Sequence, residues 1–432
     1  MSSRFWNLVV SIYGIVLFGL MFLDGRVLVL ALPLLIYLGA AIFYAPDEAQ
    51  WKISRQVSSL VVEQGAPVQV KVSVTNEGRT AEEALLEDIL PADISVDEGK
   101  SRWLVACDPG ETVEYEYTVR CTRGKHNFKR MGLLISEHFG LFHRQVELEA
   151  AGEFQSVPDV PHLGHIEIRP RQTRGFTGPI PARHSGVGMS FFGVREYQMG
   201  DSLRRVNWKV SARNEQDLFT NQFEQERIAD VGLILDARTQ TNLEVNGRNL
   251  FEYSVQAAAA LADSFLADGH RVSLLTYGFG MQRVFPGYGK IQRQLILRSL
   301  TQAEVGSNFA LESLHYLPTR LFPARSQLVM ITPLGMKDYS AFARLCQDGY
   351  EVLLISPNPV VYELQMFAQE GQLTQQAHSL ARLERSLLLR KLTRLGVVVV
   401  DWNVSQPFEQ AMYSMLGRQR QFRRNLRGSS HD

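Results

Sequence analysis

The chain has 432 residues and a formal net charge of zero, with 45 lysines and arginines against 45 aspartates and glutamates. This length allows two or three domains, and the balanced charge argues against nucleic acid as a partner. Its three cysteines, Cys107, Cys121 and Cys346, are too few and too scattered for a disulfide framework or a metal site. A reducing compartment is the simpler interpretation, although Cys107 and Cys121 share a strand-rich region and could pair in an exported protein.

Two apolar runs open the sequence, at residues 5–23 and 27–44, and only residues 24–26 separate them. Each run is close to the ~20 residues that a helix needs to cross a bilayer, whereas a signal peptide has a shorter apolar stretch and no second run. The short Asp-Gly turn makes the two helices neighbours, with both outer ends on one side. The sequence therefore predicts a transmembrane helical hairpin over residues 1–50.

Positive charge indicates which side of the membrane holds the rest of the chain. Arg4, Lys52 and Arg55 flank the outer ends of the hairpin, whereas Arg26 stands alone at its turn. Because cytoplasmic flanks carry the excess of lysine and arginine, we expect the soluble domains in the cytoplasm. The alternative, a buried hairpin in a soluble protein, would need core helices of unusual length.

Residues 51–155 follow a two-residue period. Val68, Val70, Val72 and Val74 alternate with polar residues, and turn signals such as Asp-Pro-Gly recur at short spacing. This pattern predicts an antiparallel β-sandwich.

Prolines and glycines become dense between residues 151 and 188, which favours an extended connector without periodic structure. Its two histidines, His162 and His165, lack further ligands at metal-site spacing, so we interpret them as ordinary linker residues. We assign residues 156–225 to this linker and to the polar block that ends it.

From residue 226 to residue 417, short apolar runs such as residues 231–235 alternate with helical stretches. This alternation predicts a largely parallel sheet flanked by helices. Ligands of such sheets bind at the carboxyl ends of the strands. Those ends carry Asp236, Thr332 and Asp401.

The densest polar cluster lies at residues 192–213, where several arginines stand beside Glu196, Asp201 and the aromatic Tyr197 and Trp208. Guanidinium groups pair with carboxylates in a fork geometry and stack on aromatic rings. Such a network either pins the linker to the α/β domain or forms an exposed surface for a partner protein, since arginine and aromatic residues are enriched in binding hot spots. Both interpretations stay open.

The spacing in this block resembles the signature of bacterial proteins that carry the "domain of unknown function 58", which has the form R-E-Y-x-x-G-D-x-x-R-x-[IV]-x-W-K-x-[ST]-A-R. Members of that family join two membrane helices, a β-sandwich-like segment and a Rossmann-like α/β domain similar to von Willebrand factor A. Arg123-Gly124 and residues 139–142 resemble the end of the family's sandwich segment, so the resemblance covers nearly the whole chain. Val206 matches the [IV] position of the signature and is not a candidate for binding. Our candidate partner-binding residues are Arg195, Glu196, Tyr197, Gly200, Asp201, Arg204, Arg205, Trp208, Lys209, Ser211, Ala212 and Arg213.

The resemblance implies a partner rather than a substrate. Proteins of this family are usually encoded beside MoxR-type AAA+ ATPases and are thought to assist the assembly or remodelling of protein complexes. It also implies a multi-pass protein of the bacterial inner (plasma) membrane. We therefore expect a binding or adaptor protein whose partners are such an ATPase and membrane lipid.

Domains like von Willebrand factor A can hold a divalent metal with an Asp-x-Ser-x-Ser loop. This chain keeps Asp236, but Arg238 and Gln240 stand at the serine positions, and Thr332 stands where a second aspartate often occurs. An arginine has no lone pair to give a metal. We therefore expect no metal or other cofactor, and we expect Asp236, the one candidate ligand, to pair with Arg238 or to cap a helix.

No catalytic constellation is legible, because the sequence offers neither a nucleophile with its base nor a phosphate-binding loop. Two alternatives to an adaptor remain: a hydrolase that uses Glu196 and Asp201, and an exported adhesion-type binding protein. The basic segment at residues 418–432 is expected to be a disordered tail, either lying on anionic lipid or merely solvated.

Overall fold

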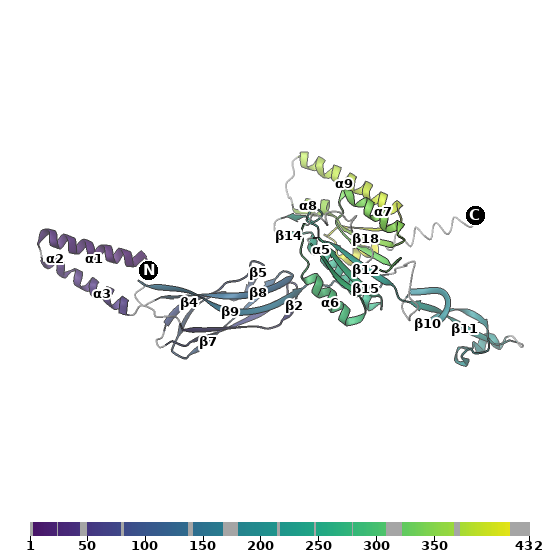
Figure 1. Ribbon diagram of the computed structural model, residues 1–432, viewed down its shortest axis with the longest axis horizontal. Helices are drawn as coiled ribbons and strands as arrows, with labels where there is room; N and C mark the ends of the chain where they lie inside the picture. The colour runs from purple at the N-terminus through teal and green to yellow at the C-terminus, as the bar shows by residue number, and fades with distance from the viewer. Residues whose placement is uncertain are drawn as a thin grey trace. The chain divides into compact units, whose positions relative to one another are not determined.

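The chain divides into two compact units, Met1–Val157 and Pro158–Asp432 (Figure 1). The predicted tail at residues 418–432 and part of the predicted linker lie outside the residues that the structure describes. This computed structural model describes residues 3–23, 25–43, 50–78, 82–136, 141–166, 180–213, 217–245, 248–278, 280–307, 322–366 and 372–414.

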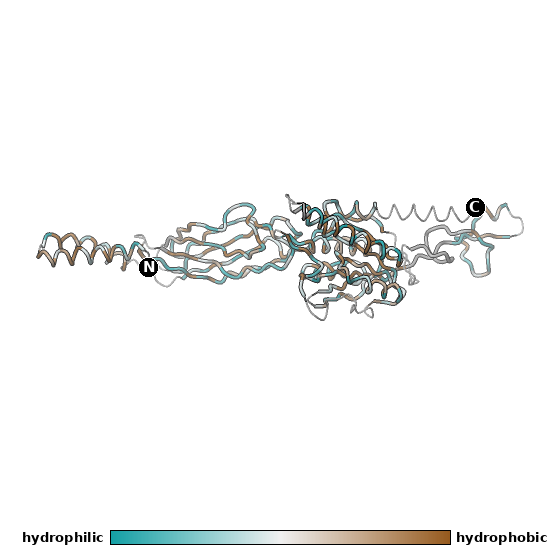
Figure 2. The backbone as a smooth tube through the Cα atoms, turned by 90° about the horizontal axis from the view of Figure 1, so that it is seen from above, coloured by the Kyte–Doolittle hydropathy of each residue, from teal (hydrophilic) through white to brown (hydrophobic). Residues whose placement is uncertain are grey.

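Two apolar helical segments begin the first unit, and each is long enough to cross a membrane. The first is α1 (Ser3–Phe22), and the second consists of α2 (Gly25–Val29) and α3 (Ala31–Phe43). The second segment is interrupted at Leu30 because Pro33 has no N–H to donate to the preceding turn and its ring crowds that turn. Most side chains of the two segments are exposed, and both segments are largely brown in Figure 2, the colour of hydrophobic residues. The two predicted apolar helices are therefore present.

The rest of the first unit is β-rich and consists of two sheets. One sheet has the strand order β1-β3-β7-β5 and the other β2-β9-β8-β4-β6, and every pairing is antiparallel except the one between β2 and β9. The strands are β1 (Trp51–Val57), β2 (Val61–Glu63), β3 (Val68–Asn76), β4 (Glu82–Asp88), β5 (Ile94–Glu98), β6 (Arg102–Cys107), β7 (Thr112–Cys121), β8 (Gly124–Ser136) and β9 (His143–Val157).

The two sheets share one hydrophobic core, as the two-residue period predicts. Val70 and Val72 of the first sheet and Leu86 and Leu133 of the second are each fully buried in it. Their polar neighbours in the sequence point outward, because successive side chains of a strand face opposite sides of the sheet.

An ion pair also lies inside this core. Arg55 donates to a carboxylate oxygen of Asp88 at 2.5 Å, and neither side chain is exposed. Tyr117 donates to the other oxygen of Asp88, and the Arg55 guanidinium lies 4.5 Å from the ring centre of Phe128. Burial, followed by the neighbouring Asp88 charge, raises the pKa of the Tyr117 hydroxyl, so it remains a donor. The pair connects the two sheets through the core.

Cys107 and Cys121 are both buried in this unit as free thiols. They lie in β6 and β7, which belong to different sheets. Burial raises the pKa of both thiols, which keeps them protonated and unreactive.

The second unit is built on a mixed sheet with the order β16-β15-β12-β17-β18-β19, in which all neighbours are parallel except the antiparallel edge strand β16. Alternate residues of β12 enter two separate cores, Leu233 and Leu235 one and Ile234 the other. The first core includes residues of α5 and α6, and the second includes residues of α7 and α9, so helices cover both faces (Figure 1). The elements are β12 (Asp230–Asp236), α5 (Phe251–Ala267), β15 (Arg271–Tyr277), β16 (Met281–Gly287), α6 (Gly289–Thr301), β17 (Gln327–Ile331), η5 (Met336–Asp338), α7 (Tyr339–Gln347), β18 (Glu351–Pro357), α8 (Pro359–Met366), α9 (Gln372–Arg394) and β19 (Val398–Trp402), with a short β13 (Glu244–Val245) and β14 (Arg248–Asn249) pair.

The predicted linker has more structure than its proline and glycine content indicates. Leu163 and Ile166 are buried in the α/β core, and His165 lies 2.9 Å from Asp268 at the end of α5. Further on, β10 (Ile180–Glu196) and β11 (Phe219–Arg227) pair as an antiparallel hairpin, with η1 (Leu203–Arg205) and α4 (Trp208–Ser211) between them. The expectation of an extended connector without periodic structure over residues 151–188 was therefore wrong for residues 151–157, which end β9, and for residues 180–188, which belong to β10.

Candidate functional site

The first half of the signature block is a tight turn closed around Asp201. Arg195 donates to one oxygen of Asp201 at 2.7 Å, and the backbone N–H of Gln198 donates to the other at 2.9 Å. The hydroxyl of Tyr197 donates to the Asp201 carbonyl at 3.0 Å. Gly200 has a φ of 106°, a conformation that a side chain would strain. These contacts give the turn one shape.

The second half of the block is tied to β11. Asn207 caps α4, because its side-chain oxygen accepts from the N–H of Val210 at 3.2 Å, and its amide nitrogen donates to Asn221 at 2.8 Å. The hydroxyl of Ser211 accepts from the N–H of Phe219 at 2.8 Å. Asn207 is not among the predicted site residues. These contacts hold the block to its own hairpin.

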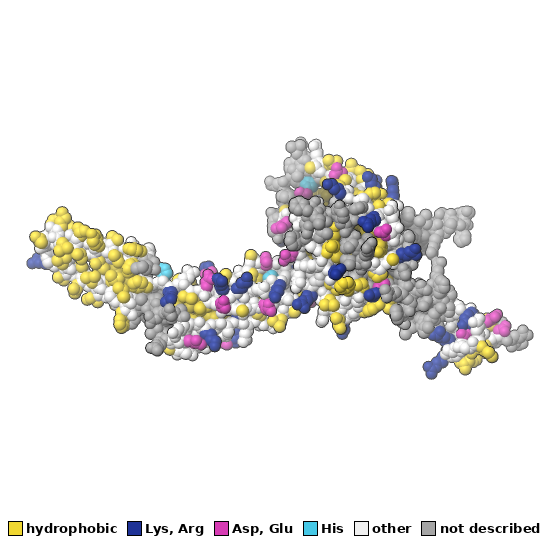
Figure 3. All heavy atoms as spheres, in the orientation of Figure 1, with side chains coloured by type: hydrophobic (Ala, Val, Ile, Leu, Met, Phe, Trp, Pro, Cys, Tyr) yellow, Lys and Arg dark blue, Asp and Glu magenta, His cyan; other side chains and the backbone are white. Residues whose placement is uncertain are grey.

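The side chains of the signature block that take no part in these contacts are exposed. Trp208 is 65% exposed, and Arg204, Lys209 and Arg213 are exposed and make no ion pair among the described residues. Leu203 and Met199 add exposed apolar surface beside them. Figure 3 shows dark blue, yellow and magenta side chains close together over the β10–β11 hairpin. Among the residues that the structure describes, no guanidinium packs against the ring of Trp208.

Asp201 is a poor candidate for a catalytic acid. The hydrogen bonds from Arg195 and from the Gln198 backbone lower the pKa of its carboxyl group. A lowered pKa favours the carboxylate, and both oxygens are already engaged by donors. The other member of the proposed hydrolase pair, Glu196, has an exposed side chain on the same strand end.

A second polar site lies at the carboxyl edge of the sheet and centres on Asp236, which is completely buried. Thr241 and Thr332 donate to the same oxygen of Asp236 at 3.0 and 2.6 Å. Arg238 donates to both carboxylate oxygens of Asp236, from Nε to Oδ1 at 2.8 Å and from Nη2 to Oδ2 at 2.7 Å. The predicted pairing of Asp236 with Arg238 is therefore present.

The same arginine binds a second carboxylate, that of Asp338, which is not among the predicted site residues. Its Nη1 and Nη2 donate to the two Asp338 oxygens at 3.1 and 2.9 Å. Arg238 is only 4% exposed. Burial alone would lower the pKa of its guanidinium, but the hydrogen bonds and charges of Asp236 and Asp338 outweigh burial and raise it. Arg238 is permanently charged between two carboxylates.

Asp401, the second acidic residue predicted at this edge, is bound by another arginine. Arg385 of α9 donates to one Asp401 oxygen from Nη2 at 2.8 Å and from Nε at 3.1 Å. It also donates to the Pro333 carbonyl and the Ser356 hydroxyl, both at 2.8 Å. Arg385 therefore fastens α9 to the ends of neighbouring strands, which is a structural task.

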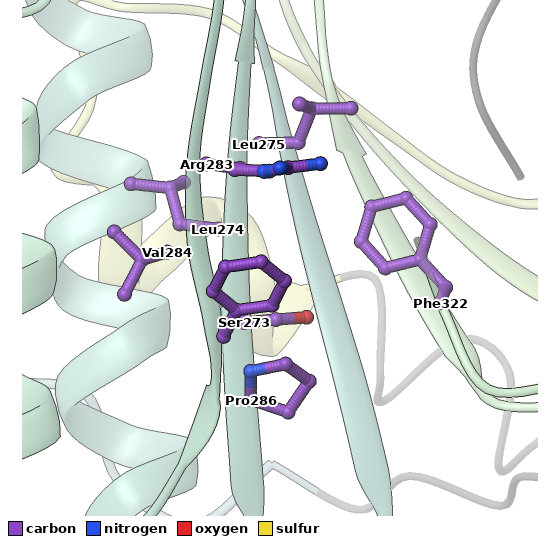
Figure 4. Close-up of a pocket in the computed structure, with 8 residues that line it drawn as sticks. Ser273, Leu274, Leu275, Arg283, Val284, Pro286 and Phe322 are labelled. Carbon is purple, nitrogen blue, oxygen red and sulfur yellow. The ribbon is translucent and has the colours of Figure 1, made fainter. Parts of the chain in front are cut away.

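The described part of the second unit contains hollows of very different size. The one in Figure 4, between β15, β16 and Phe322, measures about 10 Å³, which leaves room for at most one water molecule. Another measures about 610 Å³ and lies open between α7 and α9, lined in part by Tyr339, Leu387 and Lys391. Among the described residues, no three His, Cys, Asp or Glu side chains are grouped so that they could hold a metal ion.

The fold and these sites define a chain with two apolar helices, a β-rich domain and a mixed, mostly parallel α/β domain. Residues 193–357 match the family described as "Protein of unknown function DUF58". The family predicted from the signature is thereby confirmed: the chain carries a domain of this family, which begins in the signature block and continues into the α/β sheet.

One relative and two solved structures are similar to parts of the chain. The "Uncharacterized protein YeaD" of Bacillus subtilis (strain 168) is 28% identical over 210 residues, which are 47% of this chain and 50% of that protein, so the chain spans about half of its length. A FixG-related protein from Vibrio parahaemolyticus is 16% identical, with coverage of 26% of this chain and 98% of the other and a TM-score of 0.17. A non-cellulosomal cohesin from Archaeoglobus fulgidus is 18% identical, with coverage of 25% and 92% and a TM-score of 0.18. Scores this low carry no argument about function.

Proposed function

We propose that this chain is a membrane-anchored adaptor whose signature block binds a partner protein. The observation that carries the proposal is the division of the block into a half-buried set of side chains, which bond to one another, and an exposed set. Arg195, Asp201 and Asn207 shape it, and they leave Trp208 and Arg204 facing solvent. A rigid turn that exposes tryptophan and arginine matches the composition of binding hot spots, where such side chains contribute most of the affinity.

The partner that we propose is a MoxR-type AAA+ ATPase. This choice rests on what the family resemblance implies, together with the cationic character of the exposed surface. Arg204, Lys209 and Arg213 are opposed there by the single exposed carboxylate of Glu196 in the block. An acidic patch on the ATPase would complement these charges and speed association.

The anchoring and the domain type support the same proposal. Two apolar helices of sufficient length favour a multi-pass protein of the bacterial inner membrane, and Arg4 and Lys52 at their outer ends favour a cytoplasmic location for the domains. A mostly parallel sheet with helices on both faces supports an α/β domain similar to von Willebrand factor A. That location would bring the signature block to the compartment in which an ATP-consuming partner works.

The binding test compares two matched pairs of exposed residues on the full-length protein in detergent. The double variant Arg204→Glu with Trp208→Ala removes a cation and an aromatic ring from the signature block. The control, Arg283→Glu with Phe285→Ala, removes the same chemistry from β16, where the Arg283 guanidinium lies 5.0 Å from the exposed ring of Phe285. Affinity for the purified MoxR-type ATPase is measured by biolayer interferometry.

We expect the signature variant to lose at least about tenfold in affinity, equivalent to about 1.4 kcal/mol, and the control to stay near the wild type. Equal losses in both variants, or no loss in the first, would contradict the proposed surface. Reporter fusions to the carboxyl terminus test the location separately. A periplasmic terminus would exclude a cytoplasmic ATPase and would leave the adhesion-type alternative to be examined.

A further inference from the structure

The cluster at the carboxyl edge of the α/β sheet has an unusual charge arrangement. Two buried carboxylates, Asp236 and Asp338, face one another across the guanidinium of Arg238, at 0% and 3% exposure. Four hydrogen bonds, two to each carboxylate, fix the guanidinium in the plane between them. Buried carboxylates without a cation would be strongly destabilising, so the positive charge is essential to this arrangement.

The surrounding atoms are hard oxygen donors. Besides the two carboxylates, the hydroxyls of Thr241 and Thr332 lie 3.0 and 2.6 Å from one oxygen of Asp236. Carboxylate and hydroxyl oxygens are the ligand types that magnesium and manganese prefer. With Arg238 in place, however, the N–H groups occupy the carboxylate lone pairs that a metal would need, and the arginine itself offers none. The residues present therefore do not fit a divalent ion.

We infer that Arg238 is a built-in cation that replaces a divalent metal ion at this edge, so that the native edge is closed without any added cation. Side chains of this cluster also accept hydrogen bonds from the backbone of the turn that carries Asp338. The backbone N–H of Gly335 donates to Asp338 at 2.8 Å, and that of Leu334, at a φ of 70°, donates to Thr332 at 3.0 Å. A leucine in the left-handed region is strained, and surrounding contacts must hold it there.

Two consequences distinguish this inference from a merely structural salt bridge. First, the stability of the native domain and the binding of any partner at this edge are indifferent to chelators. Second, removal of the guanidinium leaves an oxygen-lined site with two uncompensated negative charges, which a divalent cation can neutralise. The inference concerns Asp236, Asp338 and Arg238 alone, so it stands or falls independently of the adaptor function proposed for the signature block.

The test uses full-length protein in detergent, stripped with EDTA, and follows thermal unfolding with and without Mn²⁺ or Mg²⁺. The wild type should unfold at the same temperature in all three conditions. Arg238→Ser should unfold at a clearly lower temperature in EDTA and recover by several degrees, saturably, when Mn²⁺ is added. Electron paramagnetic resonance of Mn²⁺ should show binding at least about tenfold tighter than to the wild type, and Asp236→Asn added to Arg238→Ser should abolish it.

The matched control is Arg385→Ser, which removes another buried arginine from the same edge. Arg385 pairs with the single carboxylate of Asp401, which is 40% exposed, so Mn²⁺ should not restore its loss of stability. Arg238→Lys retains a positive charge and should remain insensitive to Mn²⁺. The inference is overturned if EDTA lowers the unfolding temperature of the wild type through a site lost in Asp236→Asn. It is equally overturned if Arg238→Ser gains no Mn²⁺ binding, or stays unfolded with Mn²⁺ present.

Discussion

The ion pair inside the β-rich domain makes a quantitative prediction about stability. Replacing Arg55 with Met preserves the apolar stem of the side chain but removes the cation from the Asp88 carboxylate, which has no exposed surface in the native structure. Breaking a buried pair in this way costs about 3–5 kcal/mol. Because Tyr117 still donates to Asp88, we expect a value near the lower end, about 3 kcal/mol. Replacing both partners, Arg55→Met with Asp88→Leu, should recover most of the loss, since a well-packed apolar pair avoids the desolvation of two charges.

The assay is hydrogen exchange of the full-length protein, read by mass spectrometry on peptides from β3 and β7 over a urea series. The control pair lies on the outer face of the same domain, where Lys71 and Glu114 approach to 2.6 Å at 39% and 53% side-chain exposure. Lys71→Met should lower the stability far less than Arg55→Met does, because solvent screens exposed pairs. Equal costs for Arg55→Met and Lys71→Met, or a double variant as unstable as Arg55→Met alone, would refute the reasoning.

Three further predictions concern the second unit. Burial lowers the pKa of His270 to about 4, so its stabilising effect is complete above the ordinary value of 6.5 and is lost as the pH falls toward 4. Urea unfolding at about pH 7 and about pH 5 should therefore differ more for the wild type than for His270→Gln, by up to about 2 kcal/mol. Gly232→Ala would place a methyl group 2.5 Å from Phe322, so thermal unfolding should reveal a cost of about 1–3 kcal/mol. Asn207→Ala removes the cap of α4 and should cost about 1 kcal/mol, seen as faster local hydrogen exchange at Val210 without a change in the global unfolding temperature.

Periodicity predicted the elements of this chain well wherever burial alone decides the structure. The alternating valines from Val68 to Val74 form a buried strand face because one side of β3 lies on the core. The continuous apolar run at residues 231–235 becomes a central strand because helices cover both of its faces. Composition failed in the linker, where glycine and proline content indicated irregular chain although residues 180–196 pair with β11. Partner strands far along the sequence can stabilise a segment whose own propensity is poor.

The signature block was predictable as a unit, but the tasks of its residues were not. Arg195 and Asp201 pair as fork and carboxylate, which their types and spacing suggested. Asn207 caps α4, and the signal was available, since an asparagine directly before a helical turn is a typical cap. The exposure of Trp208 could not be predicted, because it depends on which face of a four-residue helix the hairpin leaves uncovered.

The edge of the α/β sheet shows why a local motif misses half of a site. The loop from Asp236 to Arg238 could be recognised as one that lacks metal ligands, yet the second carboxylate stands 100 residues away from Arg238, on a short turn that no motif marks. Once Asp338 is included, the arginine at a serine position is the feature that pairs with both acids. An edge closed in this way offers incoming ligands no free carboxylate at Asp236. Binding by this domain is therefore expected on surfaces beside that edge, and the exposed cations and Trp208 of the signature block are the described surface best suited to it.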